Sequence, residues 1–279
     1  MGTARALRSL LIAVWCATTG VGVYAQALPI PNRKTPKPTT EKPQPKRGQP
    51  GKDAVWVPTA QAVVEKMLDV AKVTAQDYVM DLGSGDGRTV IAAAKRGARA
   101  IGIEYDPDLV ELSKKNAEAA GVAAKATFIK ADIFETDFSK ATVITLFLGD
   151  DVNMKLRPRI LDLKPGTRIV SNTFTMEDWE ADDTLMVTDD CASWCTLHLW
   201  IVPAKVDGTW TLPQGNLALK QRFQKISGRL GSVPIRNGKL RGDGITFTVG
   251  KAHYIGHVNG NTIQGSVTGN SGTWNATKR

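Results

Sequence analysis

The chain has 279 residues, a formal net charge of +9 and three cysteines. Hydrophobic residues make up 42% and charged residues 23%, which is ordinary globular usage and excludes a chain that is disordered throughout. At about 100–200 residues per domain, the length allows one full α/β domain and a smaller second one. Residues 28–53 hold seven Lys or Arg and two acids, so we expect the folded part to be only mildly basic.

Residues 1–27 have the features of a secretory signal peptide. Arg5 and Arg8 form a positive start, a short apolar stretch follows, and Ala25 and Ala27 supply the small residues that define a cleavage site. The apolar stretch is too short for a membrane-spanning helix, which needs about 20 apolar residues. We therefore expect a cleavable signal peptide and a periplasmic or secreted protein.

The next segment, residues 28–53, is rich in Pro, Lys and Thr and lacks apolar periodicity. This composition predicts a semi-extended linker that buries no core. We favour a solvated linker, and the alternative is that its positive charge contacts an anionic membrane or cell-wall surface. The sequence gives no clear sign of nucleic-acid binding and does not indicate the oligomeric state.

From Trp56 onward, helical and extended patterns alternate, which predicts one domain over residues 54–205. Apolar strands that alternate with helices are typical of a parallel sheet covered on both faces. A first helix is predicted after Thr59, with an apolar stripe that ends at Ala71. The further elements expected are strands at 78–80, 100–104, 126–129, 141–148 and 168–171, with helices at 88–95, 107–120 and 151–163.

The pattern changes after Ser171, where segments 184–188 and 196–202 predict an antiparallel pair. Residues 206–279 show short strands separated by glycines, and Asn259-Gly260 is a strong hairpin signal. We expect a small all-β domain here, either a sandwich or an open barrel. A helix around 217–222 is a weaker alternative for that one stretch.

The strongest chemical signal is the turn Asp81-x-Gly83-x-Gly85-x-Gly87, which lies between a predicted strand and a predicted helix. Glycines allow a sharp turn and a close approach to a ligand, and the helix start offers free N–H groups. The spacing differs from the Gly-x-Gly-x-x-Gly of dinucleotide sites, and no Gly-Lys-Ser/Thr follows. Acids such as Asp81 and Asp86 would repel a diphosphate but attract a cationic ligand.

Two further acids, Glu104 and Asp132, end the second and third predicted strands. An acid in the first of these places can accept hydrogen bonds from both hydroxyls of a ribose. A carboxylate in the second place could accept one from an adenine amino group. Each acid alone is more simply a solvated loop residue or a helix cap. Together with Asp81 they converge at the carboxyl ends of adjacent strands, where open α/β sheets bind ligands.

These residues resemble the class I S-adenosylmethionine-dependent methyltransferases over about residues 54–203. The turn at Asp81–Gly87 looks like the first motif of that family, Gly102-Ile-Glu104 like the second, and Asp132 like the adenine-contacting position. The resemblance implies a seven-stranded Rossmann-like sheet with a reversed last strand, followed here by the β domain. It also implies S-adenosylmethionine as cofactor, bound by Asp81, Gly83, Ser84, Gly85, Glu104 and Asp132.

Within that family, Val57-Pro58-Thr59 and the body up to Trp179 look most similar to the ATP-synthase c-subunit lysine methyltransferases, in an exported bacterial branch. The implied acceptor is therefore a protein lysine or another amine, which lies near residues 145–148 and takes the methyl group by in-line displacement at the methyl carbon. The Asn/Asp-Pro-Pro-Tyr of many nucleobase amine methylases is missing there, which disfavours a nucleobase. Phe147 could wall a channel for an alkyl-ammonium group, although a core phenylalanine is the simpler interpretation.

No catalytic base is assigned from the sequence. Asp150, Asp151 and Asn153 are polar candidates at the same edge, and His198 is interpreted as a core histidine. Cys191 and Cys195 could form a disulfide or remain two thiols. No metal site is expected, because no further cysteine follows the signal segment and few histidines could assist.

Two other functions remain as alternatives. S-adenosylmethionine is a cytoplasmic metabolite, whereas the signal peptide directs export, so the chain could be a non-catalytic envelope protein that uses the methyltransferase fold as a binding scaffold. A nicotinamide-dependent oxidoreductase is the third interpretation, and the glycine spacing argues against it.

Overall fold

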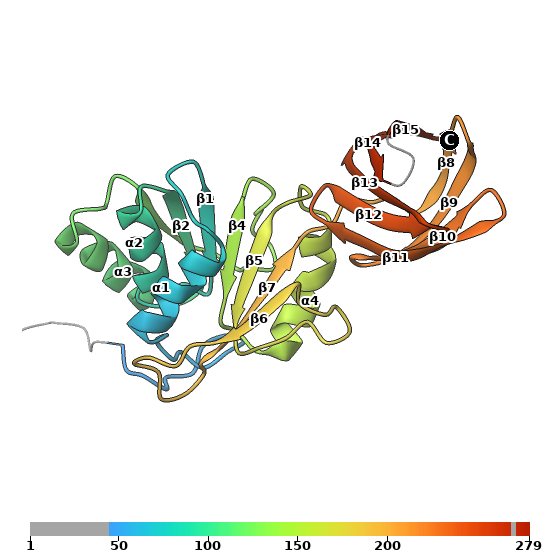
Figure 1. Cartoon of the computed structure of the whole chain (residues 1–279). Coiled ribbons are helices and arrows are strands. Elements are labelled where there is room, and N and C mark those ends of the chain that lie inside the picture. The colour runs from blue at the N-terminus through green and yellow to red at the C-terminus, as the bar shows by residue number, and fades with distance from the viewer. Residues whose placement is uncertain (1–44, 269–271) are drawn as a thin grey trace, which may run out of the picture. The chain divides into compact units, whose positions relative to one another are not determined.

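A computed structural model describes residues 45–268 and 272–279 (Figure 1). The predicted signal peptide at 1–27 and the first part of the predicted linker lie outside the described residues. Among the residues that are described, we find no helix with the length and apolar character needed to cross a membrane.

The first domain is a seven-stranded sheet in the order β3-β2-β1-β4-β5-β7-β6 (Figure 1). Strand β1 pairs in parallel with β2 and β4, whereas β7 runs antiparallel to both of its neighbours. This confirms the predicted Rossmann-like sheet with a reversed strand. Its elements are α1 (Gln61–Val70), β1 (Tyr78–Leu82), α2 (Arg88–Lys95), β2 (Arg99–Glu104), α3 (Pro107–Ala119), β3 (Ala126–Lys130), β4 (Val143–Leu146), α4 (Asp150–Leu161), β5 (Arg168–Asn172), β6 (Asp183–Met186) and β7 (Thr196–Ile201).

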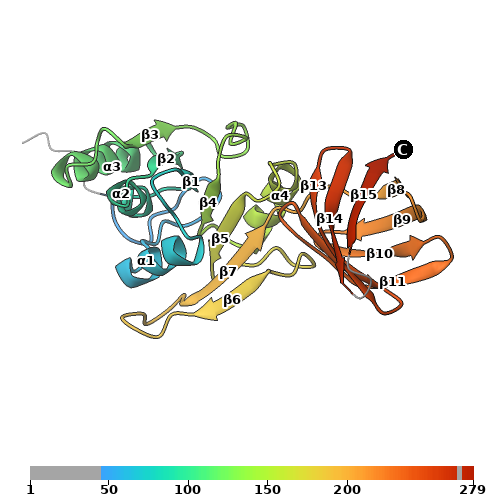
Figure 2. The ribbon, with the colours of Figure 1, turned by 45° about the horizontal axis from the view of Figure 1, so that its top comes forward.

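The second domain is a closed barrel of eight strands (Figure 2). Closure corrects the expectation of a sandwich or open barrel, because β15 pairs with β8 and leaves no free edge. The stretch 217–222 lies in β9 and is not helical. Its strands are β8 (Gly208–Leu212), β9 (Gly215–Arg222), β10 (Lys225–Leu230), β11 (Val233–Arg241), β12 (Gly244–Val249), β13 (Ala252–Asn259), β14 (Thr262–Thr268) and β15 (Gly272–Lys278).

Side chains fill the interior of this barrel, as expected for eight strands. The repeated Gly-Thr-Trp sequence places Trp210 on β8 and Trp274 on β15, and both indoles are buried in one core. Phe247 stacks on Tyr254 at 4.8 Å between ring centroids and meets Trp274 edge to face at 5.5 Å. The predicted hairpin is confirmed, since Asn259 pairs with Thr262 across the β13–β14 turn.

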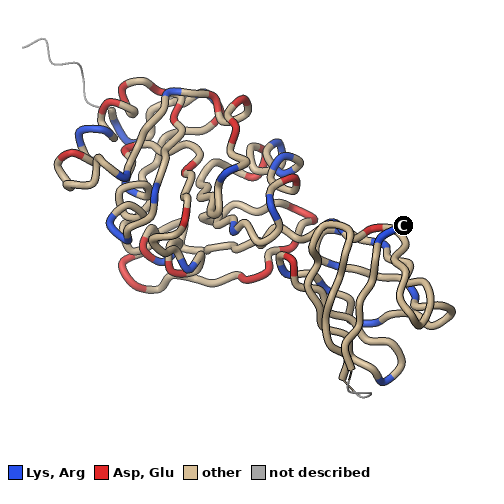
Figure 3. Tube along the Cα trace, turned by 90° about the horizontal axis from the view of Figure 1, so that it is seen from above, with Lys and Arg blue, Asp and Glu red and all other residues tan. Residues whose placement is uncertain are grey.

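Charge is divided unevenly between the two domains (Figure 3). Residues 54–205 hold 17 Lys or Arg against 23 Asp or Glu, whereas residues 206–279 hold ten Lys or Arg against two Asp. The small net charge expected of the folded part therefore conceals an acidic sheet domain and a basic barrel.

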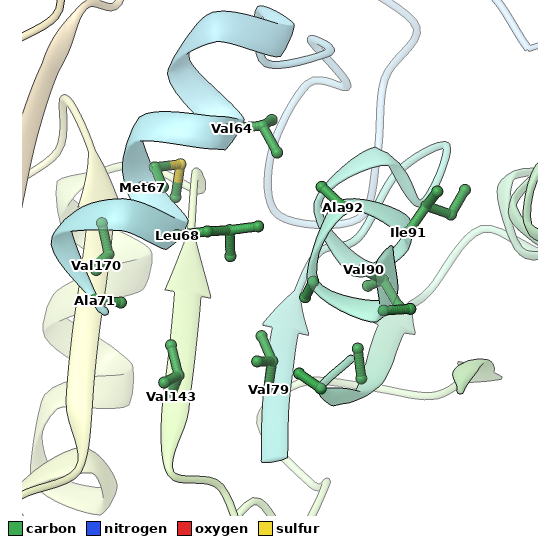
Figure 4. Close-up of a cluster of buried hydrophobic side chains, with 14 of the residues drawn as sticks. Val64, Met67, Leu68, Ala71, Val79, Val90, Ile91, Ala92, Val143 and Val170 are labelled. Carbon is green, nitrogen blue, oxygen red and sulfur yellow. The ribbon is translucent and has the colours of Figure 1, made fainter. Parts of the chain in front are cut away.

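The sheet is buried on both faces, which explains why its strands are continuously apolar. On one face, the stripe of α1 meets one valine on each of three strands, Val79, Val143 and Val170 (Figure 4). Met80 and Leu82, which also lie on β1, belong to a second core. This second core includes the buried apolar residues of α4. Packing from both faces fixes the register, so the carboxyl ends of β1, β2 and β4 lie at one edge.

Candidate cofactor and acceptor site

A pocket lies at this edge of the sheet. It is lined by the turn after β1, by the ends of β2 and β4, by the residues that follow β3, and by a segment from Gln49 to Val57. All six residues predicted to bind the cofactor, namely Asp81, Gly83, Ser84, Gly85, Glu104 and Asp132, line this one pocket. The structure therefore brings together the groups that the sequence placed at adjacent strand ends.

The turn after β1 has a backbone that only glycine adopts easily. Gly83, Gly85 and Gly87 have φ angles of 78°, 54° and 81°, in the left-handed region that disfavours residues with a Cβ. The N–H groups of Gly83 and Ser84 donate to the carbonyl of Ile103 at 2.8 and 3.0 Å, which ties the turn to β2. The turn is thus held open beside the start of α2.

Close packing beneath the turn depends on Gly102 in β2. A Cβ added at Gly102 would lie 2.5 Å from the Ser84 hydroxyl oxygen and 2.7 Å from Phe128. The Ser84 hydroxyl is buried without a hydrogen-bond partner among the described residues. Ser84 therefore faces the sheet with its hydroxyl and can meet a ligand only through its backbone.

We expect Gly102→Ala to lower the free energy of unfolding by about 1–3 kcal/mol, because the added methyl group displaces the turn. The same displacement should weaken cofactor binding. Ser84→Ala is the matched control, since it removes a hydroxyl that makes no hydrogen bond within the described part of the chain. Thermal denaturation and calorimetry with S-adenosylhomocysteine measure both effects. Equal behaviour of the two variants would show that packing at this point does not support the pocket.

Glu104 binds the turn from the end of β2. Its Oε2 accepts the Gly85 N–H at 2.8 Å, and its Oε1 accepts the N–H groups of Tyr105 and Asp106 at 2.8 and 2.9 Å. These backbone donors fix the carboxylate in the lining of the pocket. Oε1 thus has both of its lone pairs in use, whereas Oε2 keeps one and could also accept a hydroxyl donor from a ribose.

Asp81 ends β1 as a buried carboxyl with 7% of its surface exposed. It accepts a hydrogen bond from the Thr145 hydroxyl at 2.6 Å. The pKa of Asp81 is raised to about 7, mainly by burial and also by the nearby charges of Glu104 and Asp86, against hydrogen bonds from Thr145 and Thr89 that lower it. A cationic ligand in the pocket would therefore be stabilised by Asp81 and would draw it into its ionised form.

Asp132 lines the same pocket from the residues that follow β3. Its Oδ1 accepts the Phe134 N–H at 2.8 Å and its Oδ2 pairs with Lys52. The hydrogen bond from Lys52, followed by that from the Phe134 backbone, lowers the pKa of Asp132. The carboxylate is thus ionised where it lines the pocket.

The segment that carries Lys52 was expected to be a solvated linker, and here the structure differs from that expectation. Gly48 N–H donates to the carbonyl of Trp56 at 2.8 Å, and the Gln49 amide donates to Asp106 at 2.8 Å. The Trp56 indole lies directly against Gly85. An isolated tryptophan at the end of a polar stretch was the available signal that this segment packs against a folded surface.

Aromatic rings gather on the side of the pocket where β4 ends. Phe147, which lines the pocket, stacks on Phe174 at 5.6 Å and meets Trp194 edge to face at 5.9 Å between centroids. Phe147 is half-buried, so it is not the core residue that seemed simpler from the sequence. Cys191 and Cys195 form a disulfide, and Trp194 lies between them in the chain. Neither Phe174 nor Trp194 was predicted from the sequence.

The polar candidates at this edge have structural partners. Asn153 is buried and its amide donates to the carbonyls of Phe174 and Thr175, while Asp150 accepts the N–H and hydroxyl of Thr175. Asp151 is exposed on α4. His198 is half-buried on β7, with its Nδ1 3.0 Å from the Thr184 hydroxyl, and burial lowers its pKa. None of these contacts identifies a catalytic base.

Comparison with known proteins gives consistent relatives for the sheet domain. The family model described as the ANTKMT methyltransferase domain matches residues 81–183. A protein-lysine N-methyltransferase of Saccharolobus islandicus is 40% identical over 150 residues, which are 53% of this chain and 92% of that protein. An ATP-synthase c-subunit lysine N-methyltransferase of Mus musculus is 33% identical over 130 residues, 46% of this chain and 52% of that protein.

Among solved structures, an RNA methyltransferase of Salinibacter ruber in complex with S-adenosyl-L-homocysteine is 48% identical. It covers 54% of this chain and 96% of its own chain, with a TM-score of 0.50. The chain spans about half the length of the mouse relative but nearly all of the archaeal and Salinibacter ones. These matches therefore concern the sheet domain and its pocket.

Proposed function

The chain belongs to the class I S-adenosylmethionine-dependent methyltransferases, and from that premise we propose that its acceptor is the side-chain amine of a protein lysine. The observation that carries the proposal is the 40% identity to a protein-lysine N-methyltransferase over 92% of that protein's length. The similarity to lysine methyltransferases of the ATP-synthase c-subunit supports the same acceptor class.

The cofactor supplies a methyl group that is already activated by its sulfonium charge, so the protein's task is mainly to bind and align. Glu104 accepts a ribose hydroxyl at Oε2 while its contact with Gly85 keeps the turn in place. Asp81 provides a buried negative charge for the cationic end of the cofactor, and Asp132 accepts from the adenine amino group. These three roles account for three of the six acids that line the pocket.

Charge at the site favours an amine over a nucleic acid as acceptor. The sheet domain has an excess of acids over bases, which attracts a lysine-bearing protein and repels a phosphate backbone. The Salinibacter relative is described as an RNA methyltransferase, so RNA is the competing acceptor. If RNA were the substrate, the basic barrel would have to bind it.

The test is transfer of label from tritiated S-adenosylmethionine by the purified chain, with poly-L-lysine, poly-L-arginine and total RNA as parallel acceptors. We expect labelled methyl-lysine in the acid hydrolysate of poly-L-lysine, with poly-L-arginine and RNA at background. Label in RNA alone would overturn the lysine proposal. Failure to bind S-adenosylhomocysteine in calorimetry would instead favour the non-catalytic scaffold.

We also propose that the mature protein acts outside the cytoplasm. The signal features of residues 1–27 support this, and so does the Cys191–Cys195 disulfide, since disulfides persist mainly in oxidising compartments. Fractionation of cells that express the chain with and without residues 1–27 tests it. We expect the full chain outside the cytoplasm in a shortened form and the truncated chain inside.

A further inference from the structure

We propose that the loop closed by the Cys191–Cys195 disulfide builds the acceptor subsite. In this subsite, Trp194 forms an aromatic wall with Phe147 and Phe174 around the incoming amine. This inference rests on the proposed lysine methyltransferase function and adds to it the residues that select the acceptor and their dependence on redox state.

The three rings come from three different elements that meet at one edge of the sheet. Phe147 directly follows β4 and lines the cofactor pocket, and Phe174 follows the neighbouring strand β5. Trp194 comes from the loop between β6 and β7. The centroid distances of 5.6 Å and 5.9 Å from Phe147 to the other two rings make a single cluster, which borders the cofactor pocket through Phe147.

The exposure of these rings argues for a ligand rather than a core. Trp194 is 40% exposed, and Phe147 and Phe174 are only half-buried. A cluster formed only for stability would bury these surfaces, since an indole carries a large hydrophobic area. Aromatic faces also attract ammonium groups at close range. The cluster therefore suits a lysine, whose apolar stem ends in an amine.

The disulfide is what holds Trp194 in this position. Residues 192–194 are exposed, and Trp194 has a positive φ of 56°, which few non-glycine residues adopt without support. The bridge closes the loop around them, and the Val187 N–H donates to the Cys195 carbonyl at 2.8 Å. Reduction would break the bridge that closes the loop. The hydrogen bond between Val187 and Cys195 would remain at the end of the loop.

The loop is also joined to the segment that carries Phe174. Thr173, with a φ of 64°, donates its N–H to the carbonyl of Thr196, the residue after Cys195. Movement of the loop would therefore be transmitted to the residue before Phe174. In this way the disulfide supports two of the three walls.

In the reaction, the neutral lysine Nζ uses its lone pair to form a bond to the methyl carbon while the sulfur–carbon bond breaks. The bonding electron pair returns to sulfur and leaves S-adenosylhomocysteine, and the proton of the amine goes to water. The aromatic walls hold the alkyl stem in line during this step. They also retain the methylated ammonium, which favours a second and third transfer to the same lysine.

The experiment compares Trp194→Ala, Trp194→Phe and the double variant Cys191→Ser with Cys195→Ser, using poly-L-lysine and tritiated S-adenosylmethionine. We expect Trp194→Ala to raise KM for poly-L-lysine by about tenfold and to shift product toward monomethyl-lysine, and Trp194→Phe to restore most of both. The Kd for S-adenosylhomocysteine should not change. Met186→Ala, an exposed apolar residue on β6 outside the cluster, is the matched control.

The redox state of the disulfide provides a second, independent test of the acceptor subsite. Dithiothreitol should raise KM for poly-L-lysine with the wild-type chain and should have no effect on the double serine variant. Unchanged KM and product pattern in Trp194→Ala, with lysine methylation intact, would overturn the inference and leave the proposed function standing. Loss of S-adenosylhomocysteine binding in these variants would overturn it too, because the loop would then support the cofactor pocket. A wild-type chain that binds cofactor but methylates no lysine would overturn both.

Discussion

Glu104→Ala is expected to weaken S-adenosylmethionine binding by about 10- to 100-fold. A hydrogen bond from the ribose to a charged acceptor is worth about 1.5–3 kcal/mol, so its loss alone corresponds to a factor in this range. The variant also leaves the Gly85 N–H without its partner and loosens the glycine turn. Glu104→Ala should therefore lose more free energy of cofactor binding than free energy of unfolding.

Calorimetry with S-adenosylmethionine and with S-adenosylhomocysteine measures the loss. Glu118→Gln is the matched control, because it removes an exposed acid on α3 outside the pocket. Binding of Glu104→Ala within a few-fold of wild type would mean that the carboxylate does not contact the cofactor.

Asp81→Asn is expected to stabilise the cofactor-free protein at pH 8 while it weakens cofactor binding by about 100-fold. The pKa of Asp81 is about 7 in the folded protein, against an ordinary value of 3.8. A carboxyl whose pKa is raised by folding destabilises the folded state as it ionises, so this group lowers the free energy of unfolding as pH rises from about 4 to about 7. Complete ionisation of Asp81 lowers the free energy of unfolding by at most about 4 kcal/mol, at about 1.4 kcal/mol per pKa unit.

Chemical denaturation of both proteins at several pH values tests the stability arm. The difference between Asp81→Asn and wild type should grow up to about pH 7 and then level off. Cofactor affinity of the wild type should fall as pH drops below 7, by up to about tenfold per unit, because protonation removes the attraction for a cation. A pH-independent stability difference would show that Asp81 stays ionised.

The glycine turn and the acids at the strand ends could be predicted because their signals are local. A strand followed by Asp81 and alternating glycines specifies its own backbone, and each acid directly follows its own strand. Parallel pairing then brings those strand ends together without further information. The direction of the Ser84 hydroxyl was not accessible in this way, because it depends on Gly102 and Phe128.

The parts of the site that the sequence did not predict depend on contacts between residues far apart in the chain. Lys52 and Asp132 are 80 residues apart in the sequence, and the composition around Lys52 is that of a linker. Trp194 reaches Phe147 only through a loop whose shape depends on a disulfide that the sequence left open. Closure of the barrel likewise depends on one pairing, between β15 and β8, which no local pattern encodes.

That closure also limits how the C-terminal domain can take part in recognition. An open sheet presents a row of unpaired N–H and C=O groups to which a partner can add a strand, whereas a closed ring of strands offers none. Any partner of this domain must therefore be recognised by its side chains and turns. The same arrangement protects the chain against edge-to-edge association of this domain with its own copies.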